Sequence, residues 1–302
     1  MLFFLHYIKK SPAYMNRKVL AVKYQIVSDS ASDLLELADI NFSTVPLHIV
    51  VDGTDFADDA RLSVPNLLDK LRNGKSSTTA CPSPDDWITA FHDADRVFCV
   101  TITSGLSGSY NSAVIAKDIY EEKYPDRKVY IIDSLATGSK MVMLCEKLRE
   151  LIQAGHDAEE IYRQIKEYNE HCFLYFALAS LDNLARNGRV SPILAKGIKI
   201  LGIRIVGTAS TEGMLEPLSK CRGDKRSIPA IIEYMKEKGY QGGRVVITHN
   251  GNHEAAMELK RQLKTTFGTR SGEIHRTRGL CSYYAEPGSV MLAFDLSPVD
   301  PV

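Results

Sequence analysis

A chain of 302 residues exceeds the usual size of one domain, so we expect two domains and a sizeable hydrophobic core. Its 37 Lys and Arg residues balance 37 Asp and Glu residues, and this zero formal net charge argues against a nucleic-acid or strongly acidic partner. No run of eighteen uninterrupted apolar residues occurs, so the protein is predicted to be soluble, without integral membrane contact.

The six cysteines are scattered without a Cys-x-x-Cys pair, and several lie in apolar runs. We interpret them as reduced thiols in or near the core of a cytoplasmic protein, not as metal ligands. Residues 1–23 are predicted to form an N-terminal extension, in which an apolar run precedes Lys9 and Lys10, the reverse of a secretory signal. Met15 is a second candidate for the first residue.

Strands and helices alternate in the first half of the chain, which predicts a parallel sheet with helices on both faces. The predicted strands are residues 24–28, 44–51, 97–102 and 128–132, and the main predicted helices are 64–72, 109–124, 139–154 and 157–170. Residues 75–84 are interpreted as a hydroxyl-rich loop, whose Ser83, Pro84 and Asp86 cap a helix carrying Trp87. Asp58 and Asp59 are interpreted as solvated loop or capping residues.

The second half has a different order of elements, which suits a mixed or antiparallel sheet with helices on one side. Its predicted strands are residues 172–179, 203–208, 214–218, 244–248, 272–275 and 290–295, and its predicted helices are 191–201, 225–237 and 249–267. We therefore predict an N-terminal α/β/α (Rossmann-like) domain at 24–168 and a C-terminal α+β domain at 169–298.

Polar residues follow three of the predicted strands, as Asp29-Ser30, Thr103-Ser104 and Asp133-Ser134. Open α/β sheets bind ligands at the carboxyl ends of their strands, so these residues are expected to converge. The segment 103–113, Thr-Ser-Gly-Leu-Ser-Gly-Ser-Tyr-Asn-Ser-Ala, joins a strand to a helix, where small residues and free N–H groups suit a carboxylate or phosphate. Helix capping and a tight turn are the alternative reading of the same segment.

Several catalytic and cofactor motifs are missing. Gly105-Leu106-Ser107-Gly108-Ser109 is not a nucleophile elbow, which needs a glycine where Ser109 stands. The chain has neither a phosphate-binding P-loop nor a Gly-x-Gly-x-x-Gly fingerprint. His249 and His253 have helical spacing but lack the glutamate of zinc proteases, so we do not expect metal binding.

Six ordered motifs resemble those of the DegV family of bacterial fatty-acid-binding proteins, over residues 24–296. They are Val-Ser-Asp-Ser-Ala-Ser-Asp-Leu (27–34), Thr-Ala-Cys-Pro-Ser-Pro (79–84), Ser-Gly-Leu-Ser-Gly-Ser-Tyr-Asn-Ser-Ala (104–113), Ile-Asp-Ser (132–134), Gly-Arg-Val-Ser (188–191) and Cys-Arg-Gly-Asp-Lys (221–225). The resemblance implies a two-domain carrier without catalysis or cofactor, which buries one long-chain fatty acid between its domains. It further implies that the carrier presents the carboxylate to a separate ATP-dependent fatty acid kinase, which makes acyl phosphate for phospholipid synthesis.

The resemblance also implies roles for individual residues. Arg189 and Arg222 match basic positions near the pocket mouth and the kinase-facing surface. The residues expected to hold the fatty-acid carboxylate are Thr79, Thr103, Ser104, Ser107, Gly108, Ser109 and Tyr284.

The chain departs from the family pattern near this head group. Tyr284 stands where many members carry a histidine, and Ala80 stands where a serine is usual. Glu286 replaces a glycine, and an anion close to the head group is expected to repel a carboxylate. A tyrosine at this position can donate a hydrogen bond but cannot become cationic near neutral pH.

Two other classes of function remain open from the residues. One is a hydrolase or phosphotransferase that uses Ser107 or Thr79 as nucleophile beside Asp29 or Asp133, with His249 as the nearest candidate base. The other is a lipid-sensing interaction protein without a kinase partner.

Overall fold

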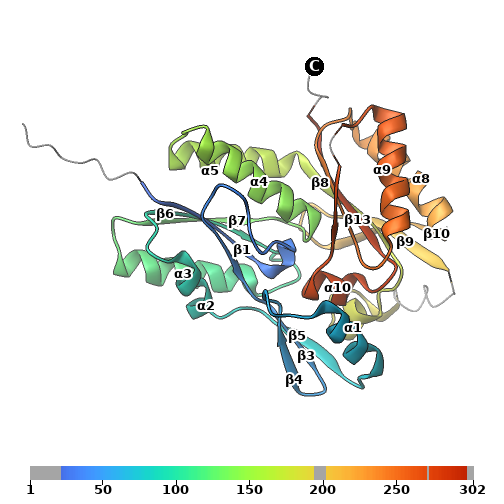
Figure 1. Cartoon of the computed structure of the whole chain (residues 1–302), viewed down its shortest axis with the longest axis horizontal. Helices are drawn as coiled ribbons and strands as arrows, with labels where there is room; N and C mark the ends of the chain where they lie inside the picture. The colour runs from blue at the N-terminus through green and yellow to red at the C-terminus, as the bar shows by residue number, and fades with distance from the viewer. Residues whose placement is uncertain (1–21, 194–201, 271, 298–302) are drawn as a thin grey trace, which may run out of the picture.

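The first half of the chain folds into a parallel sheet with the strand order β2-β1-β6-β7. The computed structural model describes residues 22–193, 202–270 and 272–297 (Figure 1). The strands of this sheet are β1 (Tyr24–Asp29), β2 (Phe42–Val45), β6 (Arg96–Thr101) and β7 (Lys128–Asp133). The parallel sheet predicted for this half is confirmed.

Helices cover both faces of this sheet (Figure 1). The helices α2 (Pro84–Phe91) and α3 (Ser109–Lys123) lie on one face, and α4 (Ser139–Gln153) and α5 (Ala158–Glu170) lie on the other. Successive strand residues point to opposite faces, so Ile26 packs toward α4 and α5 while Val27 packs toward α2 and α3. A central strand that is apolar on both sides therefore suits this arrangement.

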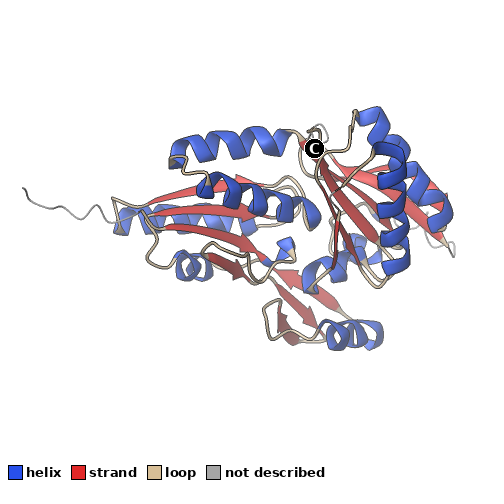
Figure 2. Cartoon of the chain, turned by 45° about the horizontal axis from the view of Figure 1, so that its top comes forward, coloured by secondary structure: helices blue, strands red, loops and turns tan. Residues whose placement is uncertain are grey.

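The second half forms a six-stranded mixed sheet with the order β10-β9-β8-β13-β11-β12. Its neighbours pair antiparallel except β11 and β12, which confirms the mixed α+β prediction. The strands are β8 (Cys172–Leu178), β9 (Ile203–Ala209), β10 (Leu215–Arg222), β11 (Val245–His249), β12 (Glu273–Arg276) and β13 (Val290–Asp295). The helices α8 (Asp224–Lys238) and α9 (His253–Phe267) cover its outer face (Figure 2).

Helix α4 lies between the two large sheets. It packs on β1 and β6 of the first sheet and on β8, β11 and β13 of the second. Every residue from Ser139 to Cys145 is buried. Because α4 serves both cores, it joins the two halves into one packed unit.

A third sheet differs from the sequence prediction. The strands β3 (His48–Val51), β4 (Thr54–Ala57) and β5 (Ser77–Ala80) form an antiparallel sheet beside α1 (Val64–Asn73). The single strand predicted at 44–51 is wrong, since Pro46 separates β2 from β3 and Pro offers no N–H to a ladder. The loop predicted at 75–84 is also wrong over β5, which pairs with β3.

Three short elements complete the described chain: η1 (Ser30–Ser32), α6 (Asp182–Arg186) and α10 (Gly279–Ala285). The sequence did not predict α10, although its Leu280 and Tyr283 belong to the core of the first half. The solvated-loop interpretation of Asp58 is wrong, because this side chain is fully buried and binds the start of α10. Its neighbour Asp59 pairs with Arg61 at the surface, as a loop residue does.

The predicted helix at 191–201 lies mostly outside the described residues, and so does most of the N-terminal extension. The predicted domain boundary at 168/169 falls in the last turn of α5. No described helix has the length and apolar character that crossing a membrane requires.

Candidate functional site

A cavity of about 340 Å³ lies at the junction of the three sheets. Its volume falls within the range of about 300–1,000 Å³ that is typical of small-molecule sites. Most of its wall is apolar. The second half contributes Leu174, Phe176, Leu178, Leu184, Leu215 and Met291, and the first half contributes Leu47, Ile102 and Leu106. Its polar side chains come from β5, the loops after β6 and β7, α10, and the segment after α6 that carries Arg189. The cavity therefore combines a mainly apolar wall with a few polar groups, which suits an amphiphile.

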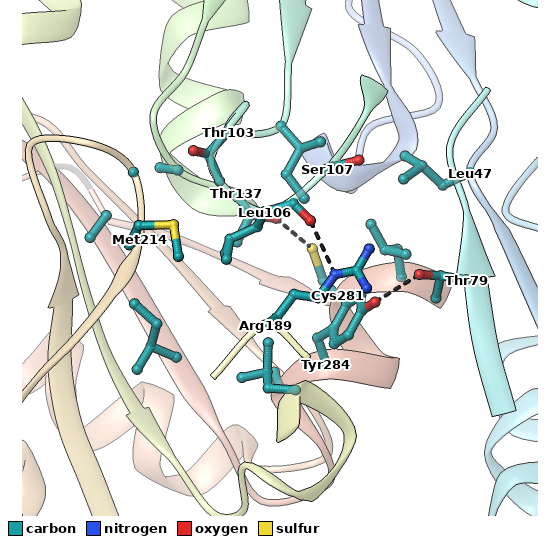
Figure 3. Close-up of a pocket in the computed structure, with 18 of the residues that line it drawn as sticks. Leu47, Thr79, Thr103, Leu106, Ser107, Thr137, Arg189, Met214, Cys281 and Tyr284 are labelled. Atoms are coloured by element: carbon teal, nitrogen blue, oxygen red, sulfur yellow. Dashed lines mark hydrogen bonds between the residues drawn. The ribbon is translucent and has the colours of Figure 1, made fainter. Parts of the chain in front are cut away.

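Thr79 and Tyr284 form a hydrogen-bonded pair on the cavity wall. Their side-chain oxygens are 2.7 Å apart and join β5 to α10. Figure 3 shows the guanidinium of Arg189 beside this pair, and its Nε donates to the carbonyl of Leu106 at 3.2 Å. Burial raises the pKa of the Tyr284 phenol above its ordinary value of 10, so the phenol remains a donor near neutral pH.

The loop after β6 supplies a second polar group. Ser107 and Gly108 line the cavity immediately before α3, and Gly108 occupies the N-cap position without a side-chain capping bond. The first N–H groups of a helix have no acceptor within the helix, and they carry its positive dipole end. Together with Thr79, Arg189 and Tyr284, this helix start can bind a carboxylate.

Six of the nine predicted site residues line the cavity: Thr79, Thr103, Ser107, Gly108, Arg189 and Tyr284. The structure places the other three elsewhere. Ser109 is fully buried, and its hydroxyl donates to Asp29 at 2.7 Å. Ser104 is exposed, and its N–H donates to Asp133 at 3.2 Å. Arg222 is exposed at the end of β10, away from the cavity lining.

Asp29 binds backbone and side-chain groups at the strand ends and does not line the cavity. Its carboxylate accepts the N–H of Ile102 at 2.9 Å, the N–H of Ala31 at 3.2 Å and the Ser109 hydroxyl. Burial raises its pKa to about 7. The expected convergence of polar strand ends is thus present, but mainly as a framework that holds the start of α3.

The sequence reasoning missed two walls of the cavity. One is α10, which contributes Leu280, Cys281 and Ala285 besides Tyr284. The other is the turn between β9 and β10, where a Cβ on Gly213 would lie 2.0 Å from Oγ1 of Thr103. A glycine with φ of +71° marks such a close approach, but the sequence does not say which loop it approaches.

Glu286 does not face the cavity. It follows α10 and accepts the N–H of Asn183 at 3.0 Å, near the start of α6. The carboxylate is therefore engaged with α6, and the expected repulsion of a head group is not supported by its position.

The similarity to known proteins extends over nearly the whole chain. The model of the DegV family, described as an uncharacterised protein family, matches residues 23–295. A DegV domain-containing protein of Streptococcus pneumoniae is 40% identical over 278 residues, which cover 90% of this chain and 99% of the relative.

Solved structures agree. A DegV family protein from Eubacterium eligens, loaded with heptadecanoic acid, matches with a TM-score of 0.89 at 42% identity, covering 91% of this chain and all of that one. The Streptococcus pneumoniae Fatty Acid Kinase (Fak) B3 protein, loaded with linoleic acid, matches with the same score and coverage at 40% identity. By its matched length and its fold, this chain belongs to the DegV family.

Proposed function

We propose that the protein binds one long-chain fatty acid in this cavity, with the carboxylate at Thr79, Ser107, Gly108, Arg189 and Tyr284. The observation that carries the proposal is the combination of an apolar wall with one polar side at the start of α3. The similarity to two solved family members that carry fatty acids supports the same ligand class.

The acyl tail and the carboxylate head are expected to contribute differently to the binding affinity. Each buried methylene contributes about 0.8 kcal/mol, so the acyl tail supplies most of the affinity. Arg189 is the one ionised side chain among the described residues that line the cavity. One cation and several neutral donors stabilise a carboxylate without holding it as tightly as a closed ion-pair site would.

We further propose that the protein presents this carboxylate to a separate fatty acid kinase, which transfers the terminal phosphate of ATP to it. The similarity to the pneumococcal Fatty Acid Kinase (Fak) B3 protein supports this role. Arg222 is exposed at the end of β10 and does not line the cavity, so it suits contact with a partner more than contact with the ligand.

The hydrolase alternative finds little support in the site. Thr79 is hydrogen-bonded to Tyr284, and Ser107 accepts the N–H of Ser109. In the described part of the chain, neither hydroxyl is hydrogen-bonded to a carboxylate or an imidazole. His249 is bonded to the N–H of Asn252 and does not line the cavity. An activated nucleophile needs an adjacent base, and this arrangement does not provide one.

Mass spectrometry of an organic extract of the purified protein tests the binding proposal. We expect a fatty acid in stoichiometric amount, with a mock purification as control. Thr79→Ala should retain less of it. A protein that is empty and also fails to take up added fatty acid would contradict the proposal.

The kinase role needs a separate assay. The loaded protein, a candidate kinase and ATP should yield acyl phosphate, which hydroxylamine traps as a hydroxamate. Arg222→Ala should slow this reaction while the bound fatty acid remains. Equal rates for the variant and the unmodified protein would remove Arg222 from the partner surface.

A further inference from the structure

The first turn of α10 is held by two carboxyl groups from the first half of the chain. Asp58 accepts the N–H of Gly279 at 3.0 Å and that of Leu280 at 2.8 Å. Asp33 accepts the N–H of Arg278 at 2.7 Å. Three successive N–H groups are thus bound by side chains that lie 221 to 245 positions earlier. We call Asp33 and Asp58 the carboxyl clamp.

The contact between Asp58 and the start of α10 is close. A Cβ on Gly279 would lie 2.7 Å from Oδ1 of Asp58 and 2.5 Å from a methyl group of Leu62. Arg278 also connects α10 to this segment. Its guanidinium donates to the backbone carbonyl of Asp59, and its Nε lies 3.8 Å from the Asp58 carboxylate. The helix start therefore has little freedom to shift while the clamp is intact.

Holding the start of a helix with a buried carboxylate carries a large desolvation cost. Asp58 is fully buried, and taking an ionised carboxylate out of water costs several kcal/mol before its hydrogen bonds are counted. Its two oxygens accept one N–H each, which an amide side chain with a single acceptor oxygen cannot do. Burial raises the pKa of both clamp carboxyls, in keeping with this cost.

The position of α10 matters for the cavity. This helix contributes Leu280, Cys281, Tyr284 and Ala285 to the wall, whereas the clamp residues themselves do not line it. A displaced α10 would separate Tyr284 from Thr79, while most of the tail wall, on β8, β10 and β13, would stay in place.

We infer that Asp33 and Asp58 are positioning residues for ligand binding, which fix α10 so that Tyr284 meets the head group of the acid. This inference rests on the proposed fatty-acid binding. Through the clamp, the first half of the chain fixes a helix of the second half that forms part of the cavity wall.

The test compares Asp58→Asn with Asp59→Asn in the full-length protein. Asp59 is a matched control, because it is the next residue, its carboxylate pairs with Arg61 at the surface, and its carbonyl bond to Arg278 survives the substitution. Hydrogen exchange of the amides of residues 279–285 reports on α10. Binding of heptadecanoic acid and of heptadecanol separates the head group from the tail.

For Asp58→Asn we expect at least about tenfold faster exchange in α10 and about tenfold weaker binding of heptadecanoic acid, the effect of one lost charge-assisted hydrogen bond. Binding of heptadecanol should weaken less, because most of the apolar wall lies outside α10. Asp59→Asn should match the unmodified protein in all three measurements. If Asp58→Asn does not fold, Asp33→Ala carries the test, because it removes the acceptor of the Arg278 N–H and leaves Asp58 unchanged.

If amide exchange in α10 is unchanged in Asp58→Asn, the clamp does not hold this helix. If Asp58→Asn weakens the binding of heptadecanoic acid and heptadecanol equally, the clamp does not act through the head group. An unmodified protein that binds no acid at all would instead overturn the proposed function. The exchange comparison needs no ligand, so these failures can be told apart.

Discussion

Two adjacent tyrosines show how different the tasks of neighbouring residues can be. Tyr283 is fully buried, and its hydroxyl bonds Ser77 at 2.9 Å and Asn187 at 2.7 Å. Tyr284 reaches the cavity and bonds Thr79. Their rings meet edge to face at 4.8 Å between centroids. Tyr283 therefore belongs to the framework, and Tyr284 belongs to the site.

Replacing each tyrosine with phenylalanine should separate these tasks. Tyr284→Phe removes a donor from the head-group side, so we expect up to about tenfold weaker fatty-acid binding with little change in stability. Tyr283→Phe removes one acceptor of the half-buried Asn187 amide, which keeps its bond to the carbonyl of Asn183, so unfolding should become easier by about 1 kcal/mol while affinity stays similar. Urea unfolding and ligand titration measure the two effects, and similar behaviour of both variants would contradict the assignment.

Glu286 carries a strained backbone. Its φ of +58° and ψ of +158° fall in a region that glycine enters readily and other residues rarely enter. Glu286→Ala keeps the strain and loses the acceptor for Asn183, whereas Glu286→Gly loses the acceptor but relieves the strain. We expect the glycine variant to be more stable than the alanine variant by about 1 kcal/mol in urea unfolding. An alanine variant that is as stable as the glycine variant would show that the conformation costs nothing.

At the scale of elements, long periodic segments were predictable and short contact-dependent ones were not. The helices α3, α4 and α5 begin where the sequence indicates, and the capping box of Ser83 and Asp86 is present. The strand β5 was missed because Ser-Thr-Thr-Ala offers no apolar alternation, and its ladder to β3 is all that marks it. The helix α10 and the burial of Asp58 were missed because each depends on the other across 221 positions.

The same limit applied to the candidate site. The hydroxyls and glycines after β6 point to a helix start that can take an anion, and the family resemblance adds Thr79, Arg189 and Tyr284. Local pattern cannot tell Ser107 from Ser109, however. Ser107 faces the cavity and Ser109 turns inward to Asp29, as the rotation of the first helical turn dictates.

Helix α4 is the element on which both large cores depend. Its Met143 is fully buried beside Cys172, Val246 and Ala293, which belong to the second half. Met143→Ala should lower the free energy of unfolding by about 2–5 kcal/mol, the usual cost of a large core truncation. Met257→Ala on α9, where the side chain is 49% exposed, is the control and should change it by no more than about 0.5 kcal/mol. A smaller loss at Met143 than at Met257 would contradict the central place of α4.

At the scale of the whole molecule, α4 and α10 make the two halves one structure. Helix α4 packs on both large sheets, and α10 completes the core of the first half with residues from the second. The clamp residue Asp33 lies at this junction, with Arg278, Cys281 and Asp58 around it. Its ionisation is therefore linked to the stability of the whole molecule.

Burial raises the pKa of Asp33 from its ordinary 3.8 to about 8. A raised pKa in the folded state contributes stability that is complete below about pH 4 and is lost as the pH rises through about 8. The stability of the unmodified protein relative to Asp33→Asn should therefore fall across this window, by up to about 1.4 kcal/mol per pH unit.

Urea unfolding of both proteins at about pH 5, 7 and 9 measures this difference. Asp59→Asn is the control, because the pKa of Asp59 is lowered and its carboxyl stays ionised throughout the window. A difference between unmodified protein and Asp33→Asn that is constant with pH would contradict the shift.

The late position of α10 in the chain has a consequence for biosynthesis. Nascent domains commonly fold in order from the N-terminus as they leave the ribosome. Here the first half cannot complete its core on that schedule, because Leu280 and Tyr283 are translated long after the strands they cover. Likewise, Gly279, whose N–H binds the Asp58 carboxyl group, is translated 221 codons after Asp58. Both the core of the first half and the ligand cavity include residues of α10, so a nascent chain that ends before Gly279 cannot form the complete pocket.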